Sequence, residues 1–220
     1  MKHFLLILLL VICNLGFTQQ LPQKITNENQ IVYHKGYILS YNETYEQANW
    51  VKYTLTPNDL IGYNFDRTNN FKEDTLIKTG SATNRDYSGS GYDRGHLKPA
   101  GDAATDSIEM VETFFLSNVS PQDPSFNRGI WKKLENYVRV VALESDSVVV
   151  ITGGVLTVGL KTIGPNKVAV PNHYYKVLFI YNNNMFETLC FILPNKKSTE
   201  ELSVYLVDLK TLELFVGLEF

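Results

Sequence analysis

The amino-acid sequence predicts an α+β domain in which helices pack on a mixed, mainly antiparallel sheet. Segments typical of strands and of helices are interspersed along the chain, without the strand–helix–strand alternation of parallel sheets. The composition is that of a globular protein, with 44% apolar and 20% charged residues among 220. Aromatic residues, mainly Tyr and Phe, make up 12% and favour sheets. We therefore expect one domain with a single sizeable core.

The chain begins with a segment that is typical of a secretory signal peptide. Lys2 precedes an unbroken apolar run over residues 4–13, which is too short to span a bilayer. We interpret residues 1–18 as a cleaved signal, residues 19–30 as a polar lead-in and residues 31–220 as the folded domain. A secreted or periplasmic location without stable membrane insertion follows from this interpretation.

The chain has two cysteines, and one of them leaves a second interpretation of this segment open. A lipoprotein signal would carry its lipid on Cys13. Because Ile12 is bulky where such signals have a small residue, we rank this alternative second. Cleavage after Thr18 would leave Cys190 alone, which excludes an internal disulfide in the mature chain. Cys190 lies in an apolar run and is interpreted as a buried structural thiol.

Apolar segments bounded by turn residues predict the strands. In chain order they lie at residues 36–41, 50–56, 114–117, 148–152, 168–170, 174–181 and 186–193. A polar turn over residues 42–49 joins the first two. Residues 57–91 hold many Asn, Asp, Ser and Gly and show little periodicity, so we expect a long ordered loop, where functional side chains often lie.

Two helices are predicted in the middle of the chain. A short helix is expected over residues 103–112, where the carboxylate of Asp102 is placed to cap the first turn. A clearer amphipathic helix has apolar residues at three- and four-residue steps, at Ile130, Leu134, Tyr137, Val138, Val141 and Ala142.

Two further helices are predicted near the C-terminus. Ser198 and Glu201 have the spacing of a capping box, which predicts a helix that runs to about residue 206. A last helix over residues 209–215 leads to Gly217, a residue type that commonly ends helices.

The segment Asp93-Arg94-Gly95-His96 carries the strongest chemical signal. Hydrolysis of a phosphodiester needs a base for water, positive charge on the phosphoryl oxygens and help for the leaving oxygen. His96, with an ordinary pKa near about 6.5, and Arg94 could supply the first two. Gly95 would let the backbone approach a neighbour closely or adopt a positive φ. Taken alone, the tetrapeptide fits a surface turn with an ion pair equally well.

Downstream residues add candidate ligands for a metal ion. Asn127 opens the amphipathic helix, and Glu135 lies eight residues along it, so its long side chain can lean back toward the helix start. An amide oxygen and a carboxylate form an oxygen-only, water-rich site of the kind that Mg²⁺ prefers. Each residue taken alone is better explained as an N-cap or a solvated helix residue.

The charge distribution is uneven along the chain. The formal net charge of -3 gives no overall attraction to polyanions, so a nucleic-acid site would need a local basic patch. Residues 128–139 offer one, because Glu135 is opposed there by Arg128, Lys132, Lys133 and Arg139.

Together, these motifs resemble the Serratia-nuclease-like family of DNA/RNA non-specific endonucleases, over residues 36–220. The signature at residues 93–96 is similar to that of the family in full. Further matching residues follow at the family's spacing, namely Leu97, Pro99, Asp102, Ser117, Asn118, Ser120, Pro121, Gln122, Asn127, Trp131 and Glu135. Several motifs in order are more specific than one tetrapeptide. The resemblance implies a ββα-metal active-site motif within the α+β fold.

The resemblance implies a role for each matching residue. His96 would be the general base that activates water, and Asn127 would be the one direct protein ligand of a hydrated Mg²⁺. Glu135 and Asp93 would hold metal-bound waters or orient neighbouring groups. Arg94 would contact the phosphate and offset charge in the transition state.

Other residues have looser matches. Asn118 would position His96 or the metal-bound waters. Arg67 resembles the family's second phosphate-binding arginine, and Arg85 remains a rival for that role. Lys132 is placed to bind substrate, because the basic excess lies where a phosphate chain would pass. His173 and Lys176 begin a predicted strand, and we interpret both as structural.

The activity that the resemblance implies is that of a secreted endonuclease, with Mg²⁺ as cofactor and Mn²⁺ as a possible substitute. It would cut DNA and RNA without sequence specificity and give 5′-phosphate products. One alternative is a catalytically silent nucleic-acid-binding relative, disfavoured because His96, Asn127 and Glu135 are all present. Another is a phosphodiesterase for a different secreted diester. The sequence leaves a homodimer open and does not identify an inhibitor protein.

Overall fold

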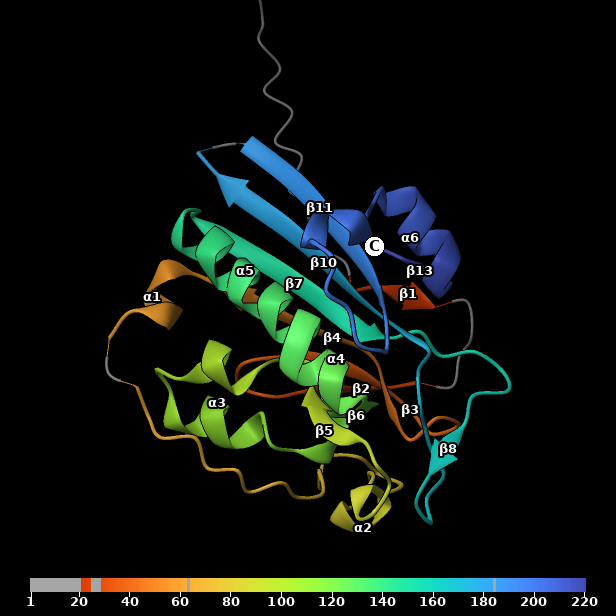
Figure 1. Cartoon of the computed structure of the whole chain (residues 1–220). Coiled ribbons are helices and arrows are strands. Elements are labelled where there is room, and N and C mark those ends of the chain that lie inside the picture. The colour runs from red at the N-terminus through yellow and green to blue at the C-terminus, as the bar shows by residue number, and fades with distance from the viewer. Residues whose placement is uncertain (1–20, 25–28, 63, 184) are drawn as a thin grey trace, which may run out of the picture.

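The computed structural model describes residues 21–24, 29–62, 64–183 and 185–220 (Figure 1). The expected signal peptide over residues 1–18 lies outside the described residues, and so does Cys13 with the lipoprotein alternative. Among the helices of the described residues, none has both the length and the apolar character that crossing a bilayer requires.

The main sheet has seven strands, and every neighbouring pair runs antiparallel. In sheet order they are β12 (Leu206–Val207), β11 (Met185–Pro194), β10 (His173–Asn182), β7 (Ser147–Gly154), β4 (Gln47–Leu55), β3 (Ile38–Asn42) and β2 (Asn29–Tyr33). The predicted α+β class is therefore confirmed. The strand predicted at residues 168–170 is β9 (Val168–Ala169), which pairs only with β8 (Thr162–Ile163).

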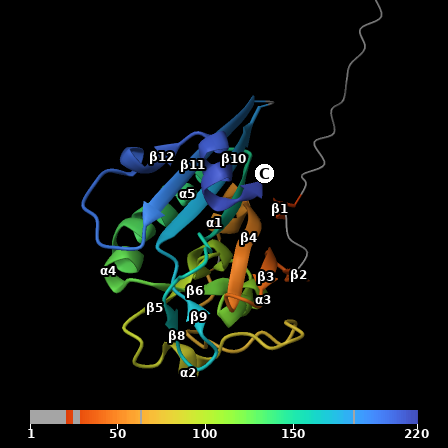
Figure 2. The same cartoon turned by 90° about the vertical axis from the view of Figure 1, so that its right-hand side faces the viewer.

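The two faces of the sheet bury separate cores. Val150 of β7 packs in a core with the helix α5 (Lys132–Leu143). The next residue, Ile151, packs in a second core with α6 (Leu209–Val216). Successive strand residues point to opposite faces, so a strand covered on both sides needs apolar residues at every position. Figures 1 and 2 show the two helices on different sides of the central strands.

The described parts of the lead-in, residues 21–24 and 29–30, contain strands that the sequence does not predict. β1 (Gln23–Lys24) pairs with β13 (Leu218–Glu219), and β2 begins inside residues 19–30. Backbone pairing therefore gives this polar segment a place in the fold that its side chains do not indicate.

The amphipathic helix is present, but the predicted start at Asn127 was wrong. Asn127 ends α4 (Pro124–Phe126), and α5 begins only at Lys132, after the irregular turn Asn127–Trp131. This turn is kinked at Gly129, where φ is -105° and ψ is -110°. The last helix is also confirmed, because α6 ends at Gly217 in the left-handed conformation with φ 68°.

The helix predicted to follow Asp102 begins later and has a different cap. In α3 (Ser107–Glu112), the carboxylate of Asp106 accepts hydrogen bonds from the amides of the first turn. Asp102 is buried and accepts from the hydroxyl of Tyr53 at 2.9 Å and from Arg139 at 2.6 Å. The cap prediction was wrong because partners far along the chain take this carboxylate.

The strand predicted over residues 114–117 is also wrong. Phe115 makes a single parallel bridge with Lys72, and the chain then turns through a 3₁₀ helix, Leu116–Asn118. Extended pairing begins only at β6 (Val119–Gln122). The apolar side chains of this segment are buried against neighbouring loops rather than in the main sheet.

The capping box predicted at Ser198 does not form. Its hydroxyl accepts from a backbone N–H two residues on and from the hydroxyl of Tyr205, at 3.0 and 2.6 Å. Glu201 pairs with Lys133 at 2.9 Å. These competing partners leave only a short 3₁₀ helix, Leu202–Tyr205, before β12.

The long loop over residues 57–91 is present and contains two single-turn helices, α1 (Pro57–Leu60) and α2 (Asn84–Tyr87). Asp74 anchors its middle to the domain. The carboxylate is 1% exposed and accepts from Nε2 of His34 at 2.9 Å and from Oγ of Ser117 at 2.6 Å. The loop is thus tied to the segment that leads into β6.

Asp74→Ala is expected to destabilise the domain. The change leaves two buried donors, those of His34 and Ser117, without their acceptor, which costs about 3 kcal/mol. We expect the Tm to fall by about 6–10 °C at neutral pH. Asp66→Ala, at an exposed position of the same loop, is the control and should leave the Tm unchanged.

The effect of Asp74→Ala should depend on pH. Burial by itself raises the pKa of Asp74, but hydrogen bonds from His34, Ser117 and a backbone N–H outweigh it and hold the pKa below 3.8. A lowered pKa stabilises the fold above the unfolded value, and this contribution is lost as the pH falls through the folded value. Thermal unfolding should show the full difference at about pH 7 and a smaller one at about pH 3. Equal Tm values at neutral pH would contradict this account.

Candidate active site

Two short strands and a helix bring the candidate residues together. β5 (Asp93–His96) pairs antiparallel with β6, with His96 opposite Val119 and Asp93 opposite Gln122. The chain then enters α4 and continues into α5, so the arrangement is a ββα unit (Figure 1). It lies beside the face of the main sheet that α5 covers.

Gly95 is required by a close approach between the two strands. A Cβ atom on this residue would lie 2.2 Å from the side chain of Gln122, which is fully buried. Gly95 is not among the glycines with positive φ. Of the two explanations that the sequence left open, close backbone approach is therefore correct.

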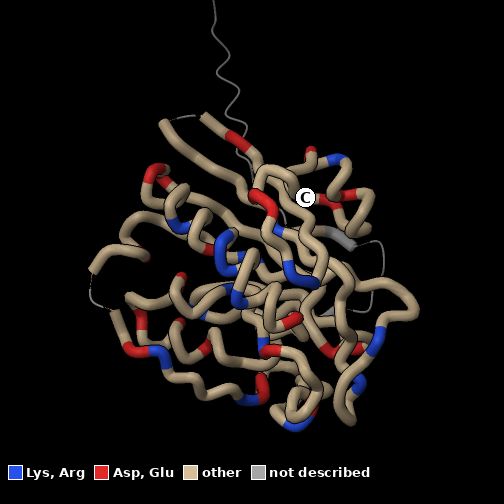
Figure 3. The backbone as a smooth tube through the Cα atoms, viewed as in Figure 1, with Lys and Arg blue, Asp and Glu red and all other residues tan. Residues whose placement is uncertain are grey.

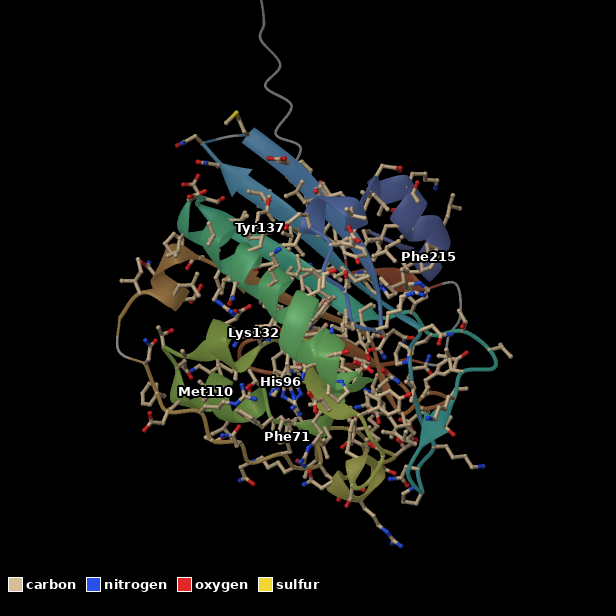
Figure 4. The ribbon with its side chains drawn as sticks, viewed as in Figure 1. Phe71, His96, Met110, Lys132, Tyr137 and Phe215 are labelled. Carbon is tan, nitrogen blue, oxygen red and sulfur yellow. The ribbon has the colours of Figure 1, made fainter. Side chains whose placement is uncertain are left out.

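The ring of His96 lies at the end of β5 among aromatic side chains. It is 7% exposed and packs against Phe71 and Phe114, with ring centroids 5.2 and 4.9 Å away. Figure 4 shows it between Phe71 and Lys132 of α5. Its Nε2 has no hydrogen-bond partner among the described residues.

The expectation of an unperturbed imidazole at His96 was wrong. Burial, helped by the positive charge of Arg67, lowers the pKa of His96 to about 3. The ring is therefore neutral at physiological pH, with a nitrogen lone pair available. The sequence did not reveal this, because both phenylalanines that bury the ring come from distant segments.

A cleft of about 360 Å³ opens over this ring and gathers most of the predicted residues. Its lining includes six of them, namely Arg67, Arg94, His96, Asn127, Lys132 and Glu135. The lining also includes Arg128 and Arg139, so five cationic side chains face one carboxylate. With a net charge of -3, a nucleic-acid site needs a local basic patch, and the cleft provides one. Figure 3 shows Lys and Arg gathered at the start of α5.

Two arginines are held over the rings that flank His96. The guanidinium of Arg94 lies 4.7 Å from the Phe71 centroid and donates to Asn84 at 2.6 Å. That of Arg67 lies 5.1 Å from the Phe114 centroid. Each planar cation is thus oriented by a ring face and keeps further donors for an anion.

The structure distinguishes between the two candidates for a second arginine. Arg67 lines the cleft, whereas Arg85 lies exposed on α2 and is not part of the lining. The long loop that carries both residues has no periodicity, so their positions follow only from how the loop is anchored.

Asp93 links the first strand of the unit to its helix. Its carboxylate accepts from Nδ2 of Asn127 at 2.9 Å and, through two bonds of 2.8 and 2.6 Å, from Arg128. A carboxylate only accepts hydrogen bonds, so the amide of Asn127 must turn its nitrogen toward Asp93. Its oxygen, Oδ1, has no hydrogen-bond partner among the described residues and is available as a ligand. Of its two predicted roles, Asp93 fits that of orienting a neighbour.

Glu135 lies half-buried one turn into α5. Burial raises the pKa of Glu135, and the nearby charge of Lys176 opposes this shift. Arg139, four residues on, pairs with Asp102 across the cleft wall at 2.6 Å. The sequence analysis counted Arg139 only as a charge. Its i,i+4 spacing from Glu135 was the signal that could have placed it on the same helix face.

Asn118 does not line the cleft. Its buried side chain accepts from the backbone N–H of Lys98 and donates to the carbonyls of Lys98 and Thr113, each at 2.9 Å. It therefore clamps the chain just after His96, so any positioning of that ring is indirect.

The described residues hold no group of three or more His, Cys, Asp or Glu side chains that could bind a metal ion. The lining nevertheless provides the amide oxygen of Asn127 and the carboxylate of Glu135. Oxygen atoms of this kind suit a hard cation that keeps several water ligands.

The chain is similar to known nucleases over most of its length. It is 35% identical to human mitochondrial Endonuclease G over 205 residues, covering 87% of this chain and 69% of that protein. It is 38% identical to Nuclease C1 of Cunninghamella echinulata var. echinulata over 203 residues, covering 84% and 80%. The structure of the EndoG/EndoGI complex, described as showing the mechanism of EndoG inhibition, matches with a TM-score of 0.82 and 34% identity. This match covers 86% of this chain and 84% of that one.

The family profile of the DNA/RNA non-specific endonucleases matches residues 18–220. The match includes the ββα unit, the basic cleft and the strands that support them. The resemblance inferred from the signature at residues 93–96 is thereby confirmed. This chain belongs to the DNA/RNA non-specific endonuclease family.

Proposed function

We propose that this protein is a metal-dependent endonuclease that hydrolyses phosphodiester bonds in DNA and RNA without sequence preference. The observation that carries the proposal is one basic cleft lined by both His96 and Asn127. A neutral imidazole and an unpaired amide oxygen can act there on the same phosphate. A silent relative would be expected to have lost one of these groups.

The residues present fit one hydrated divalent ion. Asn127 offers Oδ1 because Asp93 takes its Nδ2, and Glu135 lines the same cleft, where its carboxylate would hold metal-bound water. Mg²⁺ prefers such oxygen ligands, and Mn²⁺ accepts them as well. When bound, the ion would supply neutralisation of the leaving oxygen.

His96 would act as the general base. The imidazole lines the cleft and would accept a proton from the attacking water there, and its lowered pKa keeps it neutral until then. A bound phosphate diester adds negative charge, which offsets Arg67 and raises the basicity of the ring. Attack on phosphorus with departure of the 3′-oxygen gives a 5′-phosphate and a 3′-hydroxyl.

The arginines would bind and stabilise the phosphate. Arg94 and Arg67 present planar forks from above Phe71 and Phe114, the two rings packed against His96, and Lys132 adds a flexible charge from α5. Contacts of this kind reach the sugar–phosphate backbone rather than base edges, so they support binding without sequence preference.

We also propose that the protein acts outside the cytoplasm, secreted or in the periplasm. The support is the short basic start and apolar run of residues 1–18. A cleavage assay with plasmid, RNA and a small diester distinguishes the possible substrates.

A cleavage assay tests the proposed function. Purified protein is incubated with plasmid and with RNA, with Mg²⁺ or with EDTA. Both polymers should be degraded only with Mg²⁺, and His96→Ala should lower kcat about 10²–10⁴-fold because the general base is lost. His173→Ala, a histidine outside the cleft, is the control. Binding without cleavage would identify a silent relative. Turnover of a small diester alone would identify a different phosphodiesterase.

The two loop arginines provide a second prediction. Arg67→Ala should lower kcat/KM for plasmid cleavage about 10²-fold, because a cation at the developing phosphoryl charge is removed. Arg85→Ala should stay within about twofold, since its side chain lies outside the cleft. Steady-state cleavage rates measure both. Equal losses in the two variants would show that the loop adopts another arrangement with substrate bound.

A further inference from the structure

A lysine lies in the apolar core directly behind the cleft. Tyr174, Lys176, Leu178 and Ile180 alternate along β10 and share one face, and the other three belong to the main core. Lys176 has no exposed surface, and its Nζ has no hydrogen-bond partner among the described residues. Lysine is almost never fully buried unless it is paired, so its position requires a compensating charge.

Helix α5, on the same side of the sheet as this lysine, carries Glu135, the carboxylate that lines the cleft. Nζ of Lys176 lies 4.7 Å from the ring centroid of Trp131, which is itself fully buried. Trp131 is four residues before Glu135, so the two side chains lie on one side of the helical run. A cation over an indole face gains some attraction, but a ring does not replace a counter-ion.

Glu135 is the charge that best matches Lys176. It has no hydrogen bond or ion pair with any described side chain, whereas Asp102 is already paired with Arg139 and Tyr53. Among the charges acting on Lys176, Glu135 has the largest effect, then Asp102, with Arg139 opposing. Two opposite charges, neither in a direct ion pair among the described residues, thus act on each other at the cleft, with Glu135 in its lining and Lys176 in the core behind it.

We infer that Lys176 is a positioning residue, the buried counter-charge that holds the carboxylate of Glu135 at the cleft. The role of Glu135 toward a metal ion rests on the proposed function, but the pairing itself does not. The sequence analysis interpreted Lys176 as structural. The fold adds that its position is tied to one residue of the active site.

A double-mutant cycle on protein stability tests the pairing without metal or substrate. Thermal unfolding in EDTA is measured for Lys176→Met, Glu135→Gln and the double variant. Lys176→Met should lower the Tm by about 6 °C in the wild-type background, because the half-buried carboxylate of Glu135 loses its counter-charge. In the Glu135→Gln background the same change should shift the Tm by less than about 2 °C, or raise it.

Lys52→Met is the matched control for this cycle. Lys52 is a buried lysine of strand β4, which β7 separates from β10. Its loss should change the Tm equally in both backgrounds. If Lys176→Met does not fold, recovery of a folded protein in the double variant supports the pairing. Equal Tm losses in both backgrounds, or a double variant that stays unfolded, would overturn it.

Kinetics then test whether Lys176 acts through Glu135. At saturating Mg²⁺, Lys176→Met should lower kcat for plasmid cleavage about tenfold and leave KM unchanged, because phosphate binding is intact. In the Glu135→Gln background it should lower kcat less than about twofold. Tenfold losses in both backgrounds would refute the positioning role. A wild-type protein without activity would refute the proposed function, while the stability cycle would still decide on the pairing.

Discussion

The hydrogen bond from Asn127 to Asp93 joins the beginning of β5 to the helix that follows β6. Because a carboxylate only accepts, this bond fixes which way the amide faces and leaves its oxygen toward the cleft. Asp93 and His96 are the two ends of one short strand, so the same bond also sets the separation of the base and the candidate metal ligand. Arg128 secures the carboxylate from the solvent side. The geometry of the site thus depends on this one hydrogen bond between Asn127 and Asp93 rather than on a cluster of charged ligands.

The surrounding fold holds the segments of the site in place by packing. The antiparallel sheet and α5 form a rigid base, and the close contact at Gly95 lets β5 lie against β6. The long loop, anchored through Asp74, brings Phe71 and Arg67 to the flank of His96. Burial keeps the imidazole neutral, and the faces of Phe71 and Phe114 orient the two exposed arginines. Lys176 shows the same principle in the core, where a charge is tolerated because it lies beneath Glu135.

Local sequence patterns predicted those parts of the fold that local patterns determine. The strands β3, β4, β7, β10 and β11, the helix α5 and the glycine that ends α6 were all readable from periodicity and residue type. The predictions for Asp102 and Ser198 failed because other partners took the side chains that were placed to cap helices. At Asp102 these partners are distant in sequence, and at Ser198 they are a nearby backbone N–H and Tyr205. The sequence could not distinguish the role of Arg67 from that of Arg85, and it could not predict the burial of His96. Both depend on where an aperiodic loop is anchored. The motif spacing was sufficient to identify four residues of the cleft, namely Arg94, His96, Asn127 and Glu135.

The central claim is that a divalent ion bound at Asn127 and the ring of His96 face the same phosphate. Anomalous diffraction from crystals soaked in Mn²⁺ with a short phosphodiester tests this most directly. The account predicts one manganese peak within about 2.3 Å of Oδ1 of Asn127, with the scissile phosphate between it and the ring of His96. A manganese ion held by other side chains, or a phosphate bound away from the His96 ring, would contradict it.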